Sequence, residues 1–428
     1  MKRRTFLAGT AGALALAHGS GVRASSAADK LRLAVIGVAN RGGANLAGVA
    51  SENIVALCDV DQRNLEKAQK QFSGAELFQD YRVMLDQFEN LDGVVVSTPD
   101  HHHAPASMRA LQRGLPVYCE KPLTHTVAEA RALTVMANKA GVPTQMGTQI
   151  HAGENYRRVV EKIRAGVIGE VQRVHVWVGK GWGATSVPKP NGTAPENLDW
   201  DCWLGPAEDR PYTPNYHPAN WRRYRDFGAG TLGDMGCHYM DLPFWALGLK
   251  YPKRIVAEGP NPDAECCPLG LSARYEFEAT DSHGDLTLTW YDGDLSPKEK
   301  LEGMPIGRSG VLFVGDKGKM VATYGDHSVE LTSKGSEPKP VEKIAASIGH
   351  HNEWLEAIRS GDAARPLCRF DYSGPLTETV LLGTVAHQVG HAIQWDGATA
   401  SIVDDAEAQT LLSKTYRTGW ELMATADA

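Results

Sequence analysis

The sequence predicts an α/β protein in which an N-terminal doubly wound parallel sheet is followed by a second α/β domain with a large open, mostly antiparallel sheet. The 428 residues are too many for one ordinary core, so two domains are expected. Strand–helix–strand units repeat from residue 31 to about 150, which is typical of a parallel sheet. From about Gly153 strands with alternating apolar residues dominate, which is typical of a sheet with one open face.

The first 28 residues are predicted to be a signal peptide. Arg3-Arg4 precede a weakly apolar run, Phe6 to Ala17, and then small residues, a pattern that resembles a twin-arginine export signal. A periplasmic or secreted protein is therefore expected. The run is too short to span a bilayer, and no other stretch reaches ~18 apolar residues, so we expect no membrane insertion of the mature form.

Composition excludes several classes of partner. The net charge of −7 provides no electrostatic basis for binding nucleic acid or an anionic membrane surface. The seven cysteines form no C-x-x-C pair and predict mostly free, buried thiols. Three consecutive histidines, 101–103, cannot all reach one ion, so no metal site is expected and one functional histidine in a loop or helix start is the better interpretation.

The first strand, Leu31 to Ile36, runs into a glycine-containing turn and a helical pattern. Gly37, Ala39, Asn40, Arg41 and Gly42 occupy the place of a G-x-G-x-x-G dinucleotide motif, with Ala39 in place of the second glycine. Backbone N–H groups at the start of the helix would hold a diphosphate.

Asp59 ends the second strand, 22 residues after Gly37. An acid at this distance can accept hydrogen bonds from both ribose hydroxyls of NAD, and it would repel the additional phosphate of NADP. The alternative is a helix N-cap, which is common at strand ends. With the glycines in register we favour the ribose role, and therefore NAD over NADP.

Further polar residues follow the next strands. Thr98 and Pro99 come directly after the apolar strand Val94 to Val96, and Glu120-Lys121 follow the strand that ends at Cys119. All of them therefore fall at the ligand-binding edge of the sheet. A lysine there can exchange a proton near neutrality, although a surface loop lysine is the alternative.

The stretch "GTLGDMGCHYMD" places Asp234, His238 and Asp241 at i, i+4 and i+7, which is one face of a helix. Leu232, Met235, Tyr239 and Leu242 are expected on the opposite face. A solvated helix face is the plain alternative, but the preceding glycines let a backbone or ligand approach closely.

Together these motifs resemble the Gfo/Idh/MocA oxidoreductases. The residues that carry the resemblance are Gly37-x-Ala-x-x-Gly42, Asp59, the P-x-x-x-H of Pro99 to His103, Glu120-Lys121-Pro122, Trp221-Arg222 and the stretch "GAGTLGDMGCHYMD". The resemblance extends over residues 31–400 and implies a Rossmann domain at 29–152 and a substrate-binding and oligomerisation domain at 153–428. It also implies bound NAD or NADP, of which Asp59 favours NAD, and sugar-like or polyol substrates.

The resemblance implies roles for individual residues. His238 would be the general base, Asp234 would orient it or the substrate, and Lys121 would polarise the reacting oxygen. The implied cofactor contacts are Gly37, Ala39, Asn40, Arg41, Gly42, Asp59, Thr98, Pro99, His103, Glu120, Lys121, Trp221 and Arg222. The expected substrate contacts are His151, Trp182, Tyr216, His217, Asp234 and His238.

Residues 180–227 are rich in aromatic and polar side chains, which either stack on sugar rings or hold a long loop together. Two activities stay open. One is an NAD-dependent oxidoreductase that acts on a sugar, polyol or glycoside hydroxyl, which we favour. The other is an NAD-dependent glycosidase that oxidises, eliminates and re-reduces. The open sheet face predicts a homodimer or homotetramer formed through the C-terminal sheet.

Overall fold

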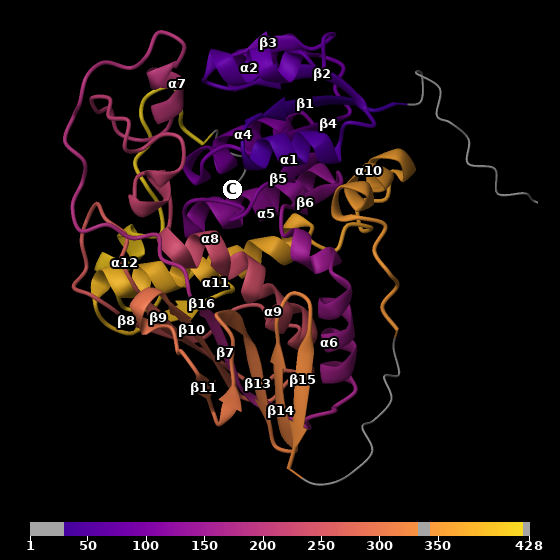
Figure 1. Cartoon of the computed structure of the whole chain (residues 1–428), viewed down its shortest axis with the longest axis vertical. Helices are drawn as coiled ribbons and strands as arrows, with labels where there is room; N and C mark the ends of the chain where they lie inside the picture. Colours follow the sequence, from indigo (N-terminus) through magenta and orange to yellow (C-terminus); the bar gives the residue numbers. More distant parts are fainter. Residues whose placement is uncertain (1–29, 333–342, 423–428) are drawn as a thin grey trace, which may run out of the picture. The chain divides into compact units, whose positions relative to one another are not determined.

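The N-terminal sheet is parallel and has six strands in the order β3-β2-β1-β4-β5-β6 (Figure 1). The strands are β1 (Arg32–Ile36), β2 (Asn53–Cys58), β3 (Glu76–Phe78), β4 (Gly93–Val96), β5 (Val117–Cys119) and β6 (Thr144–Met146). The connecting helices are α1 (Arg41–Gly48), α2 (Gln62–Gln69), α3 (Tyr81–Gln87), α4 (Asp100–Gln112) and α5 (Val127–Ala140). The strand order reverses between β1 and β4, and ligands of such sheets bind at the carboxyl ends of the strands beside that point.

The computed structural model describes residues 30–332 and 343–422. The predicted export signal, residues 1–28, lies outside them. In the described part no helix is both long and apolar enough to cross a membrane. All seven cysteines fall within it and are buried and free of disulfides, as predicted.

One helix of the first domain comes from far along the chain. In α10 (His350–Ser360), Trp354 and Leu355 join Leu33, Val35 and Val95 of the parallel sheet in one buried cluster. The helix covers apolar strand side chains that would otherwise face water. The first domain is therefore completed by residues far beyond 152.

The second sheet has nine strands in the order β15-β14-β13-β7-β10-β9-β8-β16-β17. The strands are β7 (Val171–Val178), β8 (Arg254–Glu258), β9 (Ser272–Phe277), β10 (Leu286–Asp292), β13 (Ser309–Gly315), β14 (Gly318–Ala322), β15 (His327–Leu331), β16 (Ile393–Asp396) and β17 (Ser401–Ile402). Only the β7–β10 pair is parallel. The predicted fold class, a parallel sheet plus a large mostly antiparallel sheet, is confirmed.

Helices α8 (Gly230–Tyr239), α9 (Asp241–Leu247) and α11 (Phe370–Val389) lie between this sheet and the first domain (Figure 1). Helix α6 (Glu154–Arg164) runs beside the sheet and packs against α9. Helix α11 packs against α5 of the first domain and against α8, β8 and β9 of the second. On the other face, the short β11–β12 hairpin (Lys300–Leu301 and Met304–Pro305) packs over Trp177 and Leu312.

The sequence pattern also predicts three elements that differ from the structure. It predicts a helix over 377–395, whereas α11 ends at Val389, before Gly390 in the left-handed conformation, and Trp395 belongs to β16. It predicts a single strand over 309–323, which is the β13–β14 hairpin. It predicts a helix over 104–113, but α4 begins at Asp100, so the histidines at 101–103 form its first turn and are all buried.

Candidate active site

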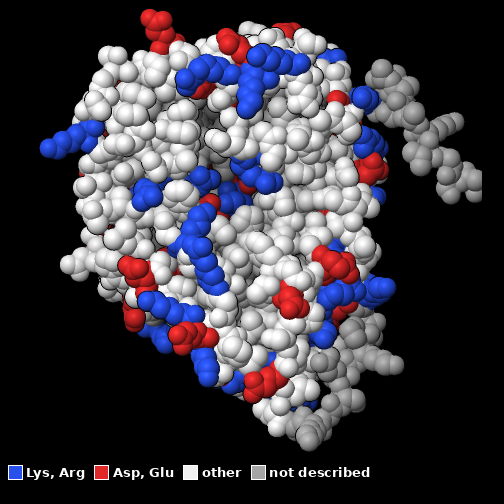
Figure 2. Space-filling model, in the orientation of Figure 1, with Lys and Arg blue, Asp and Glu red and all other residues white. Residues whose placement is uncertain are grey.

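A cleft of about 1120 Å³ lies between the carboxyl ends of β1, β2, β4 and β5 and the helix α8. Figure 2 shows Lys and Arg side chains gathered around the hollow in the middle of this face. The sequence-predicted residues that line the cleft are Gly37, Ala39, Asn40, Arg41, Asp59, Thr98, Pro99, His103, Glu120, Lys121, Trp182, His217, Trp221, Arg222, Asp234 and His238.

The turn after β1 brings bare backbone to this cleft. Gly37 has φ +80°, and a Cβ there would lie 2.5 Å from the carbonyl oxygen of Ser97. A Cβ on Gly42 would lie 2.1 Å from the carbonyl oxygen of Gly37, so Gly42 packs the helix onto the turn and does not line the cleft. Because α1 begins at Arg41, its free N–H groups are at this turn, which suits a diphosphate.

Asp59 follows β2 at the edge of the cleft. Its carboxylate accepts hydrogen bonds from the N–H groups of Val38 and Asp61, both at 3.0 Å, and from Asn64 Nδ2 at 3.1 Å. Burial raises the pKa of Asp59 above its usual value, and the two backbone N–H donors oppose that shift. The carboxylate ties the glycine turn to the start of α2, so it serves the local structure as well as lining the cleft.

Glu120 anchors the loop that carries Lys121. Its Oε1 accepts from Arg41 Nε at 3.0 Å, Asn45 Nδ2 at 2.9 Å and Gln149 Nε2 at 2.7 Å. Burial opposes ionisation of Glu120, but the charges of Arg41 and Lys121 hold its pKa below the usual value. Arg41 at the start of α1 and Glu120 after β5 thus form a charge pair across the cleft floor.

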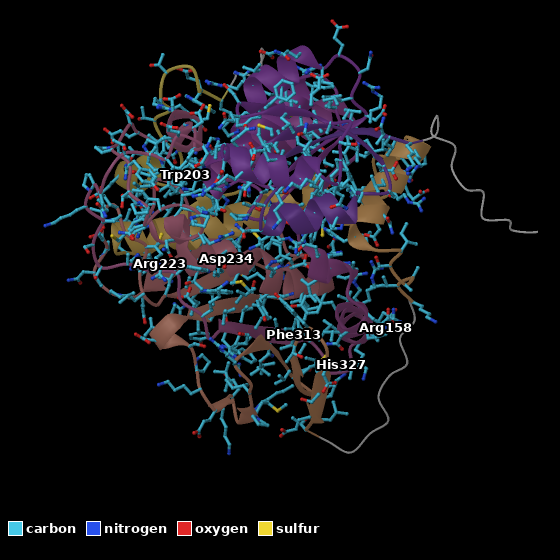
Figure 3. All side chains as sticks on the ribbon, turned by 45° about the horizontal axis from the view of Figure 1, so that its top comes forward. Arg158, Trp203, Arg223, Asp234, Phe313 and His327 are labelled. Atoms are coloured by element: carbon cyan, nitrogen blue, oxygen red, sulfur yellow. The ribbon has the colours of Figure 1, made fainter. Side chains whose placement is uncertain are left out.

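Lys121 reaches from the first domain to the second. Its Nζ donates to Asp234 Oδ1 at 2.7 Å and to the backbone oxygen of Asp234 at 2.6 Å. Both residues are buried, with Lys121 9% and Asp234 4% exposed. Figure 3 shows Asp234 on α8, at the level where the two domains meet. The pair holds an ammonium group at a defined point of the cleft.

Asp234 has further cationic and polar neighbours. Lys180 Nζ and Trp182 Nε1 donate to Oδ2 at 2.8 and 2.7 Å, and both follow β7. Arg222 Nε, on the 3-10 helix η3 (Asn220–Arg223), lies 3.1 Å from Oδ1. Although burial alone would raise it, the charges of Lys121, Arg222 and Lys180 hold the pKa of Asp234 well below its usual range.

His238 is one turn after Asp234 on α8 and lines the same cleft. Burial, aided by the nearby positive charge of Lys121, lowers the pKa of His238 to about 3. Its Nδ1 is buried and has no hydrogen-bond partner among the described residues. The imidazole is therefore neutral near pH 7. It makes no hydrogen bond to Asp234, so the structure shows no direct contact through which Asp234 would orient His238.

Asp241, the second acidic residue of the stretch 230–241, faces elsewhere. Helix α8 ends at Tyr239 and α9 starts at Asp241, so the expected common face is broken before Asp241. Met235, expected on the apolar face, lines the cleft instead. Asp241 is fully buried and accepts a hydrogen bond from the Tyr372 hydroxyl at 2.7 Å.

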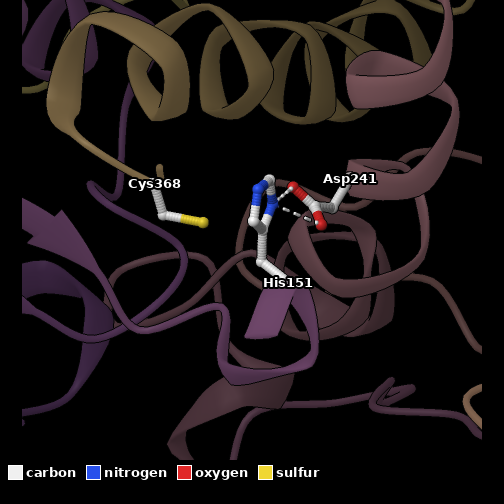
Figure 4. Close-up of side chains that lie close together, drawn as sticks. All are labelled: His151, Asp241 and Cys368. Atoms are coloured by element: carbon white, nitrogen blue, oxygen red, sulfur yellow. Dashed lines mark hydrogen bonds and ion pairs between the residues drawn. The ribbon is translucent and has the colours of Figure 1, made fainter. Parts of the chain in front are cut away.

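His151 is placed away from the cleft, contrary to its expected substrate contact. Its Nδ1 lies 2.9 Å from Asp241 Oδ1, and its ring stacks on Trp245 at 3.8 Å. Cys368 completes a buried cluster with His151 and Asp241 (Figure 4). His151 is 1% exposed, so its role in the structure is packing between η2 (Gln149–Ala152) and α9.

Some aromatic side chains of the segment 180–227 line the cleft, and others pack away from it. Trp182, His217 and Trp221 line the cleft, and Arg222 lies 4.1 Å from the Trp221 ring. Tyr216, an expected substrate contact, is 3% exposed and packs against the rings of Tyr224 and Phe227. Its aromatic partners exclude it from the cleft.

His103 braces two of the cleft loops. Its ring nitrogens lie 2.7 Å from the Pro122 oxygen and 2.9 Å from the Thr98 oxygen, and burial lowers its pKa. His101 and His102 both lie close to the Trp203 carbonyl oxygen, at 3.1 and 2.9 Å. The histidines of this run therefore tie α4 to the loops that surround the cleft.

Sequence reasoning missed several residues of the site, among them Gln149, which donates to Glu120, and three more. Asn45 binds Glu120, Lys180 binds Asp234, and Asp100 lines the cleft with both carboxyl oxygens buried and without a hydrogen-bond partner among the described residues. Burial raises the pKa of Asp100 to about 7, against the lowering effect of Arg222 and Lys121. Asp100 directly follows Thr98-Pro99, and Lys180 follows β7, so a position just after a strand was the available signal for these two residues.

Comparison with known families decides the relationship of this chain. Residues 31–148 match the Gfo/Idh/MocA description "oxidoreductase family, NAD-binding Rossmann fold", and residues 158–281 match its "C-terminal alpha/beta domain". The chain belongs to the Gfo/Idh/MocA oxidoreductase family. The predicted family, Rossmann fold and NAD cofactor are confirmed.

Curated relatives of this Gfo/Idh/MocA protein match it in part. D-apiose dehydrogenase of Paraburkholderia graminis is 34% identical over 27% of this chain and 31% of its own length. Rhizopine catabolism protein MocA of Rhizobium meliloti is 25% identical over 51% and 58%. A glycosyl hydrolase family 109 protein of Stenotrophomonas maltophilia is 27% identical over 54% of each chain. This chain thus spans about a third to just over half of the length of these relatives.

Solved structures match over most of the chain. The WlbA dehydrogenase of Chromobacterium violaceum, in complex with NADH and UDP-GlcNAcA, has a TM-score of 0.62 at 19% identity and covers 86% of this chain and 97% of its own. GenD2 from gentamicin A biosynthesis, in complex with NAD, has a TM-score of 0.60 at 20% identity over 89% and 100%. At these identities the likeness shows a shared fold.

Proposed function

We propose that this protein oxidises a hydroxyl-bearing carbon of a sugar, polyol or glycoside by hydride transfer to NAD held in the cleft. One observation carries the proposal. Asp234 fixes the Lys121 ammonium at the cleft, and the neutral imidazole of His238 lies one helical turn after Asp234 on α8. This arrangement combines a hydrogen-bond donor for a developing alkoxide with a proton acceptor. Names of the relatives, an apiose dehydrogenase and inositol 2-dehydrogenases, support this substrate class.

The residues of the cleft fit the cofactor. Gly37 and Gly42 allow the turn after β1 to pack closely, since a Cβ at either would collide with a backbone oxygen, and the N-terminus of α1 supplies N–H donors there. Asp59 is placed at the end of β2, where a carboxylate favours the ribose hydroxyls of NAD over the phosphate of NADP. Bound NAD supplies the hydride acceptor.

The residues of this chain divide the remaining work. His238 takes the hydroxyl proton at Nε2, since its ring is uncharged near pH 7 and makes no hydrogen bond to a described residue. Lys121 donates a hydrogen bond to the same oxygen while hydrogen leaves the carbon with its electron pair. Asp234 keeps the Lys121 ammonium in place.

A second function is favoured by the similarity to the glycosyl hydrolase family 109 protein over half of the chain. In that reaction a glycoside is oxidised, the aglycone is eliminated, and the ketone is reduced again. The same residues would act, and the cofactor would return to its starting state in each cycle. We favour net oxidation, and the two routes differ in their products.

The structure supports a cofactor that stays bound. The loop that precedes α7 (Trp200–Leu204) hydrogen-bonds the turn after β2: Gln62 N–H donates to the Asn197 oxygen at 2.8 Å, and Asn197 Nδ2 donates to Asp61 Oδ1 at 2.9 Å. From the C-terminal segment, Trp420 lines the cleft and stacks under Arg82 at 3.6 Å. The second domain thus bridges the cleft rim beside Asp59, which would slow dissociation.

We further propose export by the twin-arginine route to the periplasm or the medium, on the strength of Arg3-Arg4. This route carries folded proteins, which suits a retained cofactor. Arg3→Lys combined with Arg4→Lys should leave the protein in the cytoplasm, and unchanged export measured by fractionation would reject the proposal.

We also propose a homodimer or homotetramer formed through the C-terminal sheet, testable by light scattering.

The purified protein tests the main proposal directly. Protein unfolded in urea at neutral pH should release NAD or NADH, identified by chromatography. Incubation with free sugars, polyols and aryl glycosides in deuterated water should yield an oxidised sugar, read by mass spectrometry, with reduced nicotinamide in the ultraviolet spectrum. Aglycone release with deuterium beside the transient ketone and no oxidised product would establish the glycosidase instead. No change in any sugar would reject both.

A further inference from the structure

Asp234 is the meeting point of three cations. Lys121 Nζ, Lys180 Nζ and Arg222 Nε lie 2.7, 2.8 and 3.1 Å from its carboxylate oxygens. The cations come from three separate elements: the loop after β5, the end of β7, and η3. One carboxylate therefore faces three positive charges, two more than it can neutralise.

The neighbouring acids do not remove this excess. Glu120 is already paired with Arg41 at 3.0 Å. Asp100 also lines the cleft, but burial raises its pKa to about 7, so it is half protonated at neutral pH. His238 is neutral at that pH. The part of the cleft around Asp234 therefore carries a net positive charge.

Two of the cations retain unused donors. Lys180 is 40% exposed along its side chain, and its ammonium group has three N–H donors, of which Asp234 takes one and the Met235 sulfur, at 3.8 Å, takes a second weakly. Arg222 Nε is at ion-pair distance from Asp234, yet among the described residues it makes no hydrogen bond. The Arg222 guanidinium lies over the Trp221 ring, which orients it without using its N–H groups.

The reaction itself does not require this charge. A single ammonium, Lys121, suffices to stabilise one alkoxide, and the cofactor diphosphate has its own cradle at Gly37 and the start of α1. A positive charge in a partly buried site is unfavourable unless a counter-ion binds. Lys180 and Arg222 are thus placed as a recognition site for an anion.

We propose that the substrate is a sugar that carries a negatively charged group, a carboxylate or a phosphate, which Lys180 and Arg222 bind beside the reacting hydroxyl. This inference rests on the proposed action of the cleft on sugars and narrows its substrate class. A planar guanidinium and an ammonium together match the oxygens of a carboxylate or phosphate. A neutral sugar would leave these groups, together with Lys121, to share the single negative charge of Asp234.

Binding of matched sugar pairs tests this directly. Glucuronate and glucose 6-phosphate would be compared with glucose, and galacturonate with galactose, by calorimetry on the protein with its cofactor. We expect at least one anionic member to bind at least tenfold tighter than its neutral partner, with an affinity that falls as salt rises. Neutral members that bind as tightly in every pair, or no binding by any anionic member, would overturn the proposal. Comparison of the uronates with glucose 6-phosphate shows whether the site prefers a carboxylate or a phosphate.

Variants identify the residues. Lys180→Met keeps the length of the side chain and should lower the ratio of anionic to neutral affinity about tenfold, and Arg222→Met should act in the same direction. Lys300→Met, on the exposed β11 away from the cleft, serves as the control and should leave the ratio unchanged. Circular dichroism and retained cofactor report folding. A ratio unchanged in both Lys180→Met and Arg222→Met would reject the assignment.

The proposed function can fail separately. If the anionic sugars bind with the expected preference but no oxidised or cleaved product forms, the oxidoreductase proposal fails and the anion site stands. If product forms with equal efficiency from neutral and anionic members and their affinities are equal, the anion site fails and the oxidoreductase proposal stands.

Discussion

Lys121 Nζ and Asp234 Oδ1 lie 2.7 Å apart although 113 residues separate them. Lys121 belongs to the parallel sheet domain and Asp234 to a helix packed on the antiparallel sheet. The pair fixes the ammonium at the junction of the two domains, at the place where a substrate oxygen would have to be polarised. Its geometry therefore links domain packing with the chemistry proposed for the cleft.

Loss of the Lys121 ammonium is expected to abolish most of the activity. Lys121→Met should lower kcat by about 10² or more, because removal of a positioned acid–base group has an effect of that size. The nucleotide content should be preserved, since the phosphate cradle is formed by backbone groups of Gly37 and α1. Steady-state rates and released nucleotide would be measured beside Lys300→Met. Near wild-type kcat in Lys121→Met would remove its proposed role.

Asp100 should impose a pH dependence near neutrality. Its pKa is raised to about 7, so the carboxyl loses its proton above that pH and cancels part of the positive charge of Lys121 and Arg222. The KM for an anionic sugar should therefore rise several-fold, up to about tenfold, between pH 6 and pH 8. Asp100→Asn should flatten the profile. A wild-type KM that falls or stays level over this range would contradict the assignment.

Buried histidines should make the fold sensitive to acid. Burial lowers the pKa of His102 and of His350 to about 3, below the ordinary value near 6.5 of an unfolded chain. Their contribution is complete above pH 6.5 and is lost as pH falls toward 3, because the unfolded chain binds protons first. Each can steepen the pH dependence of the unfolding free energy by up to about 1.4 kcal/mol per pH unit.

Urea unfolding at pH 4, 5, 6 and 7 would measure this dependence. His350→Gln should be less stable than wild type at pH 7 and lose less stability on acidification. His283→Gln, in a loop near the end of β9, is the matched control. A slope that is the same in His350→Gln and wild type would show that His350 does not contribute.

Cofactor choice should depend on Asp59. Because a carboxylate repels the 2′-phosphate, NAD should bind at least tenfold tighter than NADP to protein stripped of nucleotide. Asp59→Asn removes the charge but keeps one acceptor oxygen, for the N–H group of Val38 or of Asp61, and should narrow that difference. Quenching of tryptophan fluorescence would report both affinities. Tighter binding of NADP by the wild-type protein would refute the role of Asp59.

Local sequence was enough to predict the framework of the site. Strand–helix spacing, the two glycines at 37 and 42, and polar residues directly after apolar strands placed Asp59, Thr98 and Lys121 at one edge of the sheet, where the structure has them. These features follow from backbone geometry over a few residues. A turn that requires glycine, and a ligand-binding position at the carboxyl end of a parallel strand, follow the same backbone geometry in any protein.

The composition of the site was decided by packing between distant segments. Lys180 and Arg222 approach Asp234 only because β7, η3 and α8 are folded against one another, and α10 completes the parallel sheet domain from beyond residue 349. Tyr216 and His151, of residue types that suit a sugar site, were drawn instead into aromatic and hydrogen-bonded clusters. Periodicity along a chain determines which face of an element is apolar. It does not determine which neighbour covers that face, and burial by that neighbour decides which polar groups are left to meet a ligand.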